Sequence, residues 1–250
     1  MRGWSRAELA EKLGVSAETV SKWEQGVNEP GKEKLTLLEK NLELSAFGGD
    51  GELRNPRLFD EEQIAAFLNS KLKAGNLTEA LNALSYATEK HAGTYRKPVA
   101  ARVPYINHPL TMACHALALG LEDDELIAAL LLHDVAEDCG VKANELPFSP
   151  EVQRLVALVT KPDKPFDEDA YYAAIARDPR ASLIKCIDRC HNLSGMSFGF
   201  STQKIAQYVE ETERYYPSLL ETVKACPEYG NAAWLLKYQI RSLIELAKRK

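Results

Sequence analysis

One apolar stretch near the middle of the 250-residue chain ends on an imidazole and three carboxylates, in the run Leu130-Leu131-Leu132-His133-Asp134-Val135-Ala136-Glu137-Asp138. Its length and composition predict one buried helix from Glu125 to Cys139, closed by Gly140. At helical spacing, each member of the His-Asp pair would stack over one member of the Glu-Asp pair. Carboxylates in the last turn of a helix face the negative end of its dipole, which is unfavourable unless a cation compensates. The run therefore predicts a metal site, and the alternative is a solvated acidic helix end beside one core-facing histidine.

A second segment offers another imidazole at the predicted start of a helix. Pro109 can open a helix that runs through Leu119 and ends at Gly120. His108 precedes this proline directly, so we expect its side chain at the N-terminus of that helix.

A third segment begins with Asp178-Pro179, a capping residue followed by a residue favoured in the first helical turn. In the helix that follows, Lys185, Asp188 and Asn192 share one face at steps of three and four residues. The opposite face is mostly apolar. A polar stripe on an otherwise apolar helix needs partners.

The three segments together offer two imidazoles and two aspartates as metal ligands: His108, His133, Asp134 and Asp188. A mixed nitrogen and oxygen set of this kind suits manganese, iron or zinc. Four protein ligands also leave positions open for water and substrate, which implies a catalytic rather than a structural metal.

These motifs resemble the HD-domain metal phosphohydrolases, and among them the (p)ppGpp hydrolase domain of RelA/SpoT-type and small alarmone hydrolase proteins. The resemblance covers about Leu77 to Leu220. His108 matches the histidine of the family's Tyr-x-x-His-Pro motif, and His133 with Asp134 matches the HD pair. Asp188 matches the last aspartate of its Lys-x-x-Asp-(Arg/Lys)-x-x-Asn motif.

The Glu137-Asp138 dyad matches the feature that separates this subfamily from most other HD proteins. The resemblance implies hydrolysis of the 3′-pyrophosphate of a guanosine polyphosphate, (p)ppGpp, to GDP or GTP and pyrophosphate. It implies Mn²⁺ as the cofactor, with iron or zinc as alternatives. In that reaction Glu137 would orient or deprotonate a water, and Asp138 would position Glu137 or that water.

The resemblance also implies residues for the substrate. Arg96 and Lys97 would face the base and the 5′-phosphates, with the Arg96 guanidinium stacked on guanine. Asn192, one turn beyond Asp188, would hydrogen-bond to ribose or phosphate, and Lys204 would approach the pyrophosphate.

Two departures from the family pattern bear on the nucleotide. The spacer between Arg96 and Pro104 is longer than usual, and Gly195 stands where these enzymes often have a threonine or an aspartate. One alternative is therefore an HD phosphohydrolase for another nucleotide, such as a deoxynucleotide or a 2′/3′-phosphorylated cofactor. Another is a DNA-binding regulator that uses the HD pocket as a nucleotide sensor, although the intact dyad argues against it.

The remaining histidines and the cysteines carry no comparable signal. We expect His91, His115 and His191 to be packed or solvent-facing imidazoles rather than ligands. The five cysteines contain no Cys-x-x-Cys pair and predict buried thiols, not a zinc finger or a disulfide framework: Cys114, Cys139, Cys186, Cys190 and Cys226.

The N-terminus resembles a Cro/repressor-type helix-turn-helix, with Gly14 at the turn and a Trp-Glu-Gln-Gly exit. Its recognition helix is expected from Ala17 to about Gln25 and would offer four side chains to a DNA groove, Glu18, Thr19, Ser21 and Lys22. Residues 1–40 hold seven basic side chains against seven glutamates, so no net charge drives phosphate binding. Because only Met1 to Trp4 precede the motif, its usual first helix is expected to be truncated or to start upstream.

The whole pattern predicts an all-α chain with a helix-turn-helix module over 1–45, a linker over 46–59 and an HD-type helical bundle over 60–250. No convincing alternating strand occurs, and no synthetase segment is expected after the last hydrolase-like helices. The net charge of −5 argues against broad nucleic-acid or membrane affinity. The chain has no apolar stretch of signal or membrane length, which predicts a cytosolic protein.

Overall fold

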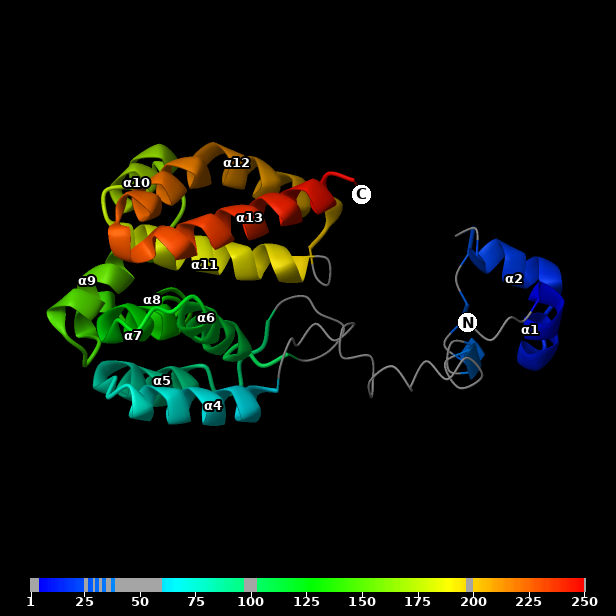
Figure 1. Cartoon of the computed structure of the whole chain (residues 1–250), viewed down its shortest axis with the longest axis horizontal. Helices are drawn as coiled ribbons and strands as arrows, with labels where there is room; N and C mark the ends of the chain where they lie inside the picture. Colours follow the sequence, from blue (N-terminus) through cyan, green and yellow to red (C-terminus); the bar gives the residue numbers. More distant parts are fainter. Residues whose placement is uncertain are drawn as a thin grey trace. The chain divides into compact units, whose positions relative to one another are not determined.

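The computed structural model divides the chain into two units, Met1–Leu58 and Phe59–Lys250 (Figure 1). The structure describes residues 5–24, 27–28, 30–31, 33–34, 37–38, 60–96, 103–196 and 200–249. Within these ranges no strand occurs and an isolated β-bridge joins Tyr95 to Pro104. The predicted all-α class is therefore confirmed. The expected linker and Lys97 lie outside the described residues.

Two short helices of the first unit, α1 (Arg6–Leu13) and α2 (Ala17–Glu24), meet at a tight turn. Ser5 and Glu8 cap α1 reciprocally, since each side chain accepts a hydrogen bond from the other residue's amide. Gly14, with φ of 63°, ends α1 in the left-handed region that favours glycine. The predicted helix-turn-helix geometry is confirmed, and its apolar contacts are buried at Ala10, Leu13 and Val20.

The second unit is a bundle of helices whose starts follow ordinary capping chemistry. The Asp178 carboxylate accepts from the Ala181 amide (2.9 Å) and Pro179 occupies the first turn, as the sequence predicts. The helices in chain order are α4 (Glu61–Ala74), α5 (Thr78–Lys90), α6 (Asn107–Ala118), α7 (Asp124–Leu132), α8 (Val135–Asp138), α9 (Pro150–Val159), α10 (Glu168–Ile175), α11 (Pro179–Gly195), α12 (Thr202–Ala225) and α13 (Gly230–Ala247), with 3₁₀ turns at Ala143–Glu145 and Pro227–Tyr229.

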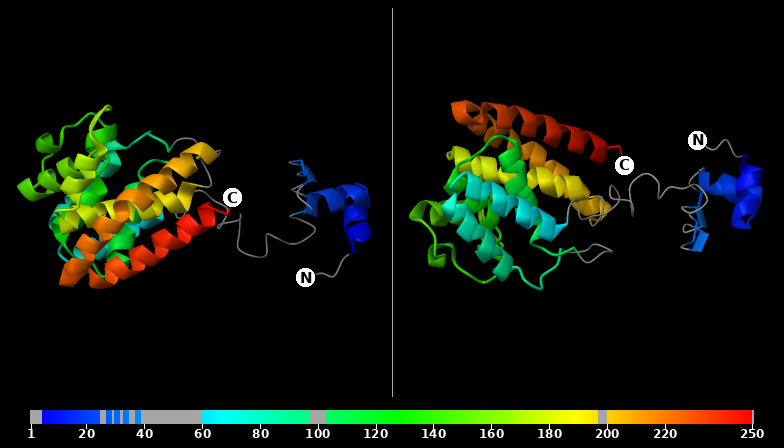
Figure 2. Two further views of the ribbon diagram at one scale, coloured as in Figure 1. Left: turned by 90° about the horizontal axis from the view of Figure 1, so that it is seen from above. Right: turned by 60° about the horizontal axis from the view of Figure 1, so that its bottom comes forward.

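The helices α6 and α7 lie between two outer groups, α4 with α5 on one side and α11 to α13 on the other (Figures 1 and 2). Every residue of α7 from Leu126 to Leu132 is fully buried, which suits a helix that neighbours cover on several sides. This packing holds the C-terminal end of α7 and the N-terminal part of α6 inside the bundle. Among the described residues, no helix is both long and apolar enough to span a bilayer.

One predicted helix is wrong. The segment expected to run unbroken from Glu125 to Cys139 is divided into α7 and α8 by a turn at His133 and Asp134. Adjacent residues on a continuous helix point about 100° apart. At the turn, in contrast, the His133 Nε2 and Asp134 Oδ2 atoms lie 3.0 Å apart. The break thus lets two neighbouring side chains face the same point.

A largely buried charge network, centred on Glu211, joins α10, α11 and α12. The Glu211 carboxylate accepts from Lys161 (2.7 Å) and from the Tyr172 hydroxyl, and it lies 3.1 Å from Arg189. Although burial alone would raise it, the pKa of Glu211 is lowered to about 2, chiefly by Arg189 and Lys161. Arg189, 4% exposed, also lies 4.3 Å from the ring centroid of Tyr208.

We expect Glu211→Gln to lower the free energy of unfolding by about 3 kcal/mol, because it leaves the buried Arg189 charge uncompensated. The Glu211 pKa is depressed in the folded chain, so its contribution is complete above pH 4.5 and is lost as the pH falls toward about 2. Denaturant unfolding at pH 7 and pH 3 measures both effects. Glu213→Gln is the matched control, because this α12 residue pairs with Lys248 at the exposed surface and should change stability little. Equal losses in the two variants would contradict the role given to Glu211.

Candidate metal centre

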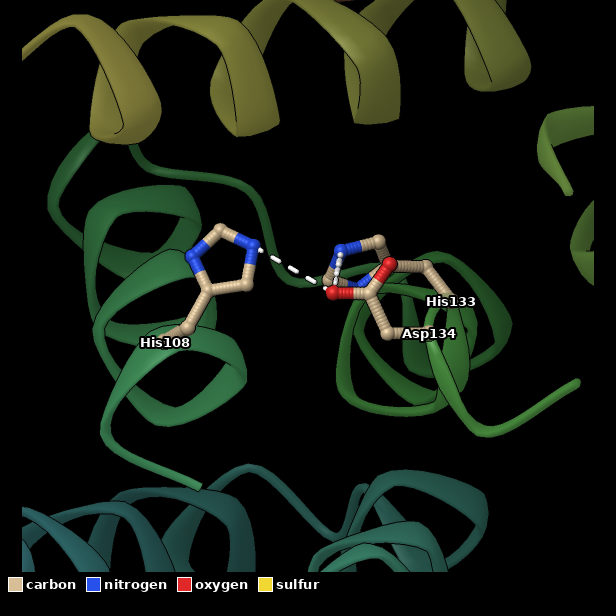
Figure 3. A group of neighbouring side chains, drawn as sticks. All are labelled: His108, His133 and Asp134. Atoms are coloured by element: carbon tan, nitrogen blue, oxygen red, sulfur yellow. Dashed lines mark ion pairs between the residues drawn. The ribbon is translucent and has the colours of Figure 1, made fainter. Parts of the chain in front are cut away.

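Three of the predicted metal ligands meet at the point where α6 faces the turn between α7 and α8. One ligand atom from each of His108, His133 and Asp134 lies within 4.8 Å of the others. Figure 3 shows both imidazole rings turned toward the Asp134 carboxylate. The Nε2 atoms of His108 and His133 lie 3.6 Å and 3.0 Å from Asp134 Oδ2.

The fourth predicted ligand, Asp188, approaches the same point from α11. Its Oδ1 atom lies 3.2 Å from His108 Nε2, although Asp188 is not part of the tight group of three. Its Oδ2 accepts from Lys185 Nζ (3.1 Å), and its Oδ1 accepts from Asn192 Nδ2 (2.6 Å). Burial alone would raise the pKa of Asp188, but Lys185 and His108 hold it well below its usual range. Asp188 therefore presents a charged carboxylate to the site.

The two histidines are arranged to offer their Nε2 atoms. His133 Nδ1 lies 2.9 Å from the Leu130 carbonyl oxygen, and because a carbonyl can only accept, this nitrogen carries the hydrogen. The buried Nε2 of His133 has no hydrogen-bond partner among the described residues. Burial, reinforced by the charge of Arg96, lowers the pKa of His108 to about 4, so this ring is neutral near pH 7. Neutral imidazoles are the form that binds metals, and His108 is in this form. Although burial alone would lower it, the Asp134 carboxylate raises the pKa of His133, so a cation bound there would replace a proton on Nε2.

These observations fit a divalent cation. The donor set combines two imidazole nitrogens with two carboxylates, and one buried nitrogen of the set, His133 Nε2, faces the Asp134 carboxylate without a hydrogen-bond partner among the described residues. A second layer of contacts holds the ligands, since the Tyr105 hydroxyl donates to Asp134 Oδ2 at 2.6 Å.

A pocket of about 410 Å³ opens beside these ligands. Both members of the acidic dyad, Glu137 and Asp138, line it and are exposed to it. Burial and the nearby Asp134 charge raise the pKa of Glu137. The pocket is otherwise rich in cations and aromatic rings, contributed by Arg96, Lys161, Lys185, Arg189, Lys204, Tyr95, Tyr105, Phe200 and Tyr208. A divalent cation at this point, together with the two carboxylates and the cationic side chains of the pocket, would suit hydrolysis of a phosphorylated substrate.

Comparison with known families and proteins agrees with this chemistry. Residues 83–165 match the HD domain family, and residues 1–47 match a helix-turn-helix family. Residues 83–165 therefore belong to an HD domain. The matched range contains the group of three ligands, whereas Asp188 lies beyond it on α11.

Curated relatives of the HD domain carry two kinds of name. A probable GTP pyrophosphokinase of Mycobacterium leprae (strain TN) is 37% identical over 147 residues, which cover 55% of this chain and 18% of the relative. A guanosine-3′,5′-bis(diphosphate) 3′-pyrophosphohydrolase of Aquifex aeolicus (strain VF5) is 35% identical over 150 residues, covering 56% and 21%. The chain thus spans about a fifth of the length of these relatives. The resemblance to RelA/SpoT-type proteins is confirmed by these matches.

A solved structure shares the fold. It is described as a metazoan ortholog of SpoT that hydrolyzes ppGpp and plays a role in starvation responses. The match has a TM-score of 0.54 and 23% sequence identity, and it covers 67% of this chain and 94% of that one.

Three of the four residues expected to bind the substrate line the pocket, and the fourth lies outside the described residues. Lys204 lines the pocket and lies 4.6 Å from the ring centroid of Phe200. Arg96 also lines the pocket, but its guanidinium donates to Asn192 Oδ1 (2.6 Å), and Asn192 donates its own amide to Asp188. In this structure Arg96 therefore contacts Asn192, and Asn192 contacts the proposed ligand Asp188. Lys97 lies outside the described residues.

Sequence reasoning missed several residues of the HD domain site. His191 was expected to be merely packed or solvent-facing, yet its Nδ1 lies 2.7 Å from His108 Nδ1. Tyr105 stands in the quoted Tyr-x-x-His-Pro motif, which was the available signal for its contact with Asp134. Arg189 stands at the (Arg/Lys) position of the quoted Lys-x-x-Asp-(Arg/Lys)-x-x-Asn motif, which was the available signal for it, whereas nothing in the local pattern identified Lys161. His91 is buried and stacked on Tyr105 as a packed ring (4.8 Å between centroids), but it also lines the pocket.

The four side chains expected to contact DNA lie on α2. Glu18 and Lys22 are exposed and form an ion pair (2.8 Å), so their charges face each other. Thr19 and Ser21 are half-buried, and the Thr19 hydroxyl contacts that of Ser16 (2.9 Å). The helix reaches Glu24, and the expected end at Gln25 lies outside the described residues.

Proposed function

We propose that the HD domain hydrolyses the 3′-pyrophosphate of (p)ppGpp to give GDP or GTP and pyrophosphate, using one divalent ion. The observation that carries this proposal is the Glu137-Asp138 dyad in a cation-rich pocket that is also lined by His108 and Asp134, two members of the group of three. The names of the hydrolase relative and of the solved structure support the substrate class. The pyrophosphokinase names of other relatives make hydrolysis itself the point to test.

The ligands proposed for the ion are His108, His133, Asp134 and Asp188, and Mn²⁺ is the proposed metal, with iron or zinc as alternatives. When bound, such an ion would polarise a phosphoryl oxygen and lower the pKa of a water from about 16 toward 7. The protein's own residues would hold the ion, bind the substrate and transfer protons.

Glu137 is proposed to take a proton from the attacking water, and Asp138 to position Glu137 or that water. The water oxygen bonds to the phosphorus attached to the 3′-oxygen, the bond between that phosphorus and the 3′-oxygen breaks, and the 3′-oxygen takes up a proton. Lys204, Lys161 and Arg189 line the same pocket and would face phosphate oxygens. The Nε and NH1 groups of Arg189 have no hydrogen-bond partner among the described residues. Arg96 and Lys97 stay the proposed contacts for the base and the 5′-phosphates, and Asn192 stays the proposed contact for ribose or phosphate.

Product analysis tests the proposal. We expect purified chain with Mn²⁺ and ppGpp to release pyrophosphate and GDP, and we expect no product from ATP with GDP or GTP. A panel of deoxynucleotides and 2′/3′-phosphorylated cofactors is the comparison set. Release of orthophosphate, or turnover of a panel compound but not of ppGpp, would overturn the assignment of the substrate and favour an HD phosphohydrolase for another nucleotide.

For the N-terminal unit we propose DNA binding through α2, with Glu18, Thr19, Ser21 and Lys22 toward the groove. The match of residues 1–47 to a helix-turn-helix family and the capped pair of helices support it. We also propose the division of the chain into 1–45, 46–59 and 60–250. A mobility shift of the full chain on DNA from its own upstream region at low salt is the expected result, and no shift of any such fragment would contradict it.

A further inference from the structure

Three nitrogen-bearing side chains from distant parts of the chain meet at one atom, the Nδ1 of His191. Arg96 NH1 lies 3.2 Å from it, and His108 Nδ1 lies 2.7 Å from it. His191 follows Asp188 on α11, whereas His108 lies at the start of α6. The meeting point is on the far side of the His108 ring from the carboxylates that face its Nε2.

The guanidinium decides which nitrogen carries each hydrogen. Arginine can only donate, so His191 Nδ1 must be an acceptor and its hydrogen must be on Nε2. His108 Nδ1, which contacts the same acceptor, must then carry a hydrogen and donate. The lone pair of His108 is thereby left on Nε2, 3.2 Å from Asp188 Oδ1 and 3.6 Å from Asp134 Oδ2. The two carboxylates repel this lone pair, so the contacts at Nδ1 hold His108 in a form that a cation between the lone pair and the carboxylates would stabilise.

The same guanidinium reaches the fourth ligand by a second route. Arg96 NH2 donates to Asn192 Oδ1 (2.6 Å), and Asn192 Nδ2 donates to Asp188 Oδ1 (2.6 Å). These bonds orient the Asn192 amide, because its oxygen is held by a donor and its nitrogen by an acceptor. One arginine therefore holds the partners of two proposed ligands, one on α6 and one on α11.

We propose that His191 is a positioning residue that fixes the tautomer of His108, and that Arg96, through His191 and Asn192, prearranges His108 and Asp188 for a divalent ion. This inference rests on the proposed metal-dependent function. It gives Arg96 a role before any nucleotide binds, in addition to the contact with the base proposed above. Partners of this kind commonly change metal affinity by about 10- to 100-fold when they are removed.

Metal affinity without nucleotide is the first test. We expect His191→Phe, which keeps a ring but no acceptor, to weaken Mn²⁺ binding by about 10- to 100-fold in calorimetry. His191→Asn places an acceptor oxygen near the position of Nδ1 and should recover most of that affinity. Arg96→Met should also weaken Mn²⁺ binding, which an arginine that contacts only substrate would not do.

Controls separate positioning from general damage. His115→Phe changes a half-buried histidine of α6 that does not line the pocket, so it should leave Mn²⁺ affinity unchanged. Thermal unfolding of each metal-free variant reports whether it folds. Wild-type affinity in folded His191→Phe would overturn the inference while leaving the proposed function intact, whereas a wild-type chain that binds no divalent ion would overturn both.

The tautomer can be read directly in the metal-free protein. Imidazole ¹⁵N spectra should show His108 with its hydrogen on Nδ1 in the wild type. In His191→Phe we expect the hydrogen to move to Nε2, where it can donate to Asp188. A wild-type His108 with its hydrogen on Nε2 would contradict the inference whatever the metal affinity.

Discussion

His133→Ala is expected to abolish both turnover of ppGpp and stoichiometric binding of Mn²⁺. The substitution removes the one donor nitrogen of the group that is buried without a hydrogen-bond partner, 3.0 Å from Asp134. It also leaves His108 as the remaining imidazole of the proposed set beside the Asp134 and Asp188 carboxylates. Metal content after dialysis, together with pyrophosphate release, measures the effect. Asp188→Ala should give the same pair of losses.

His115→Ala is the matched control, because it removes a half-buried imidazole that does not line the pocket. It should keep wild-type metal content and turnover. A His133→Ala chain that still bound one ion tightly and hydrolysed ppGpp would show that the ion is held by other residues.

Glu137→Gln is expected to keep the metal and lose rate by about 10²- to 10⁴-fold, the usual contribution of a positioned general base. The side chain lines the pocket but does not belong to the group of three that meet at the metal position. Gln keeps its size and polarity and removes its ability to accept a proton. The value of kcat for pyrophosphate release, measured at saturating Mn²⁺, reports the loss.

Glu145→Gln serves as the control for charge, since Glu145 is exposed, pairs with Lys142 and lies outside the pocket lining. Loss of the ion in Glu137→Gln would make Glu137 a ligand, and an unchanged kcat would remove it from the proton transfer.

Helix starts and the grouping of His108, His133 and Asp134 were readable from the sequence because their signals are local. Asp178 with Pro179, for example, predicts the start of α11. Packing decides where other helices end: α12 continues through Pro217 to Ala225, and Val223 near its end is fully buried. Caps mark where a helix can start, whereas neighbouring helices decide how far it continues.

The turn at His133 and Asp134 was not readable, because the apolar period of α7 runs into it without a proline or glycine. The contacts of His191 were missed for a different reason. Its partners Arg96 and His108 lie 95 and 83 residues away along the chain, so no local pattern pairs them. The position of His191 on α11 indicates which face of the helix its side chain occupies. Which residues it contacts depends on how the helices pack together.

Titration of metal-depleted chain with Mn²⁺, followed by measurement of pyrophosphate release from ppGpp, tests most directly whether turnover requires one bound divalent ion. We expect negligible release from the depleted chain and a rate that rises with added ion until one equivalent is bound. Full activity in the metal-depleted preparation would contradict this expectation.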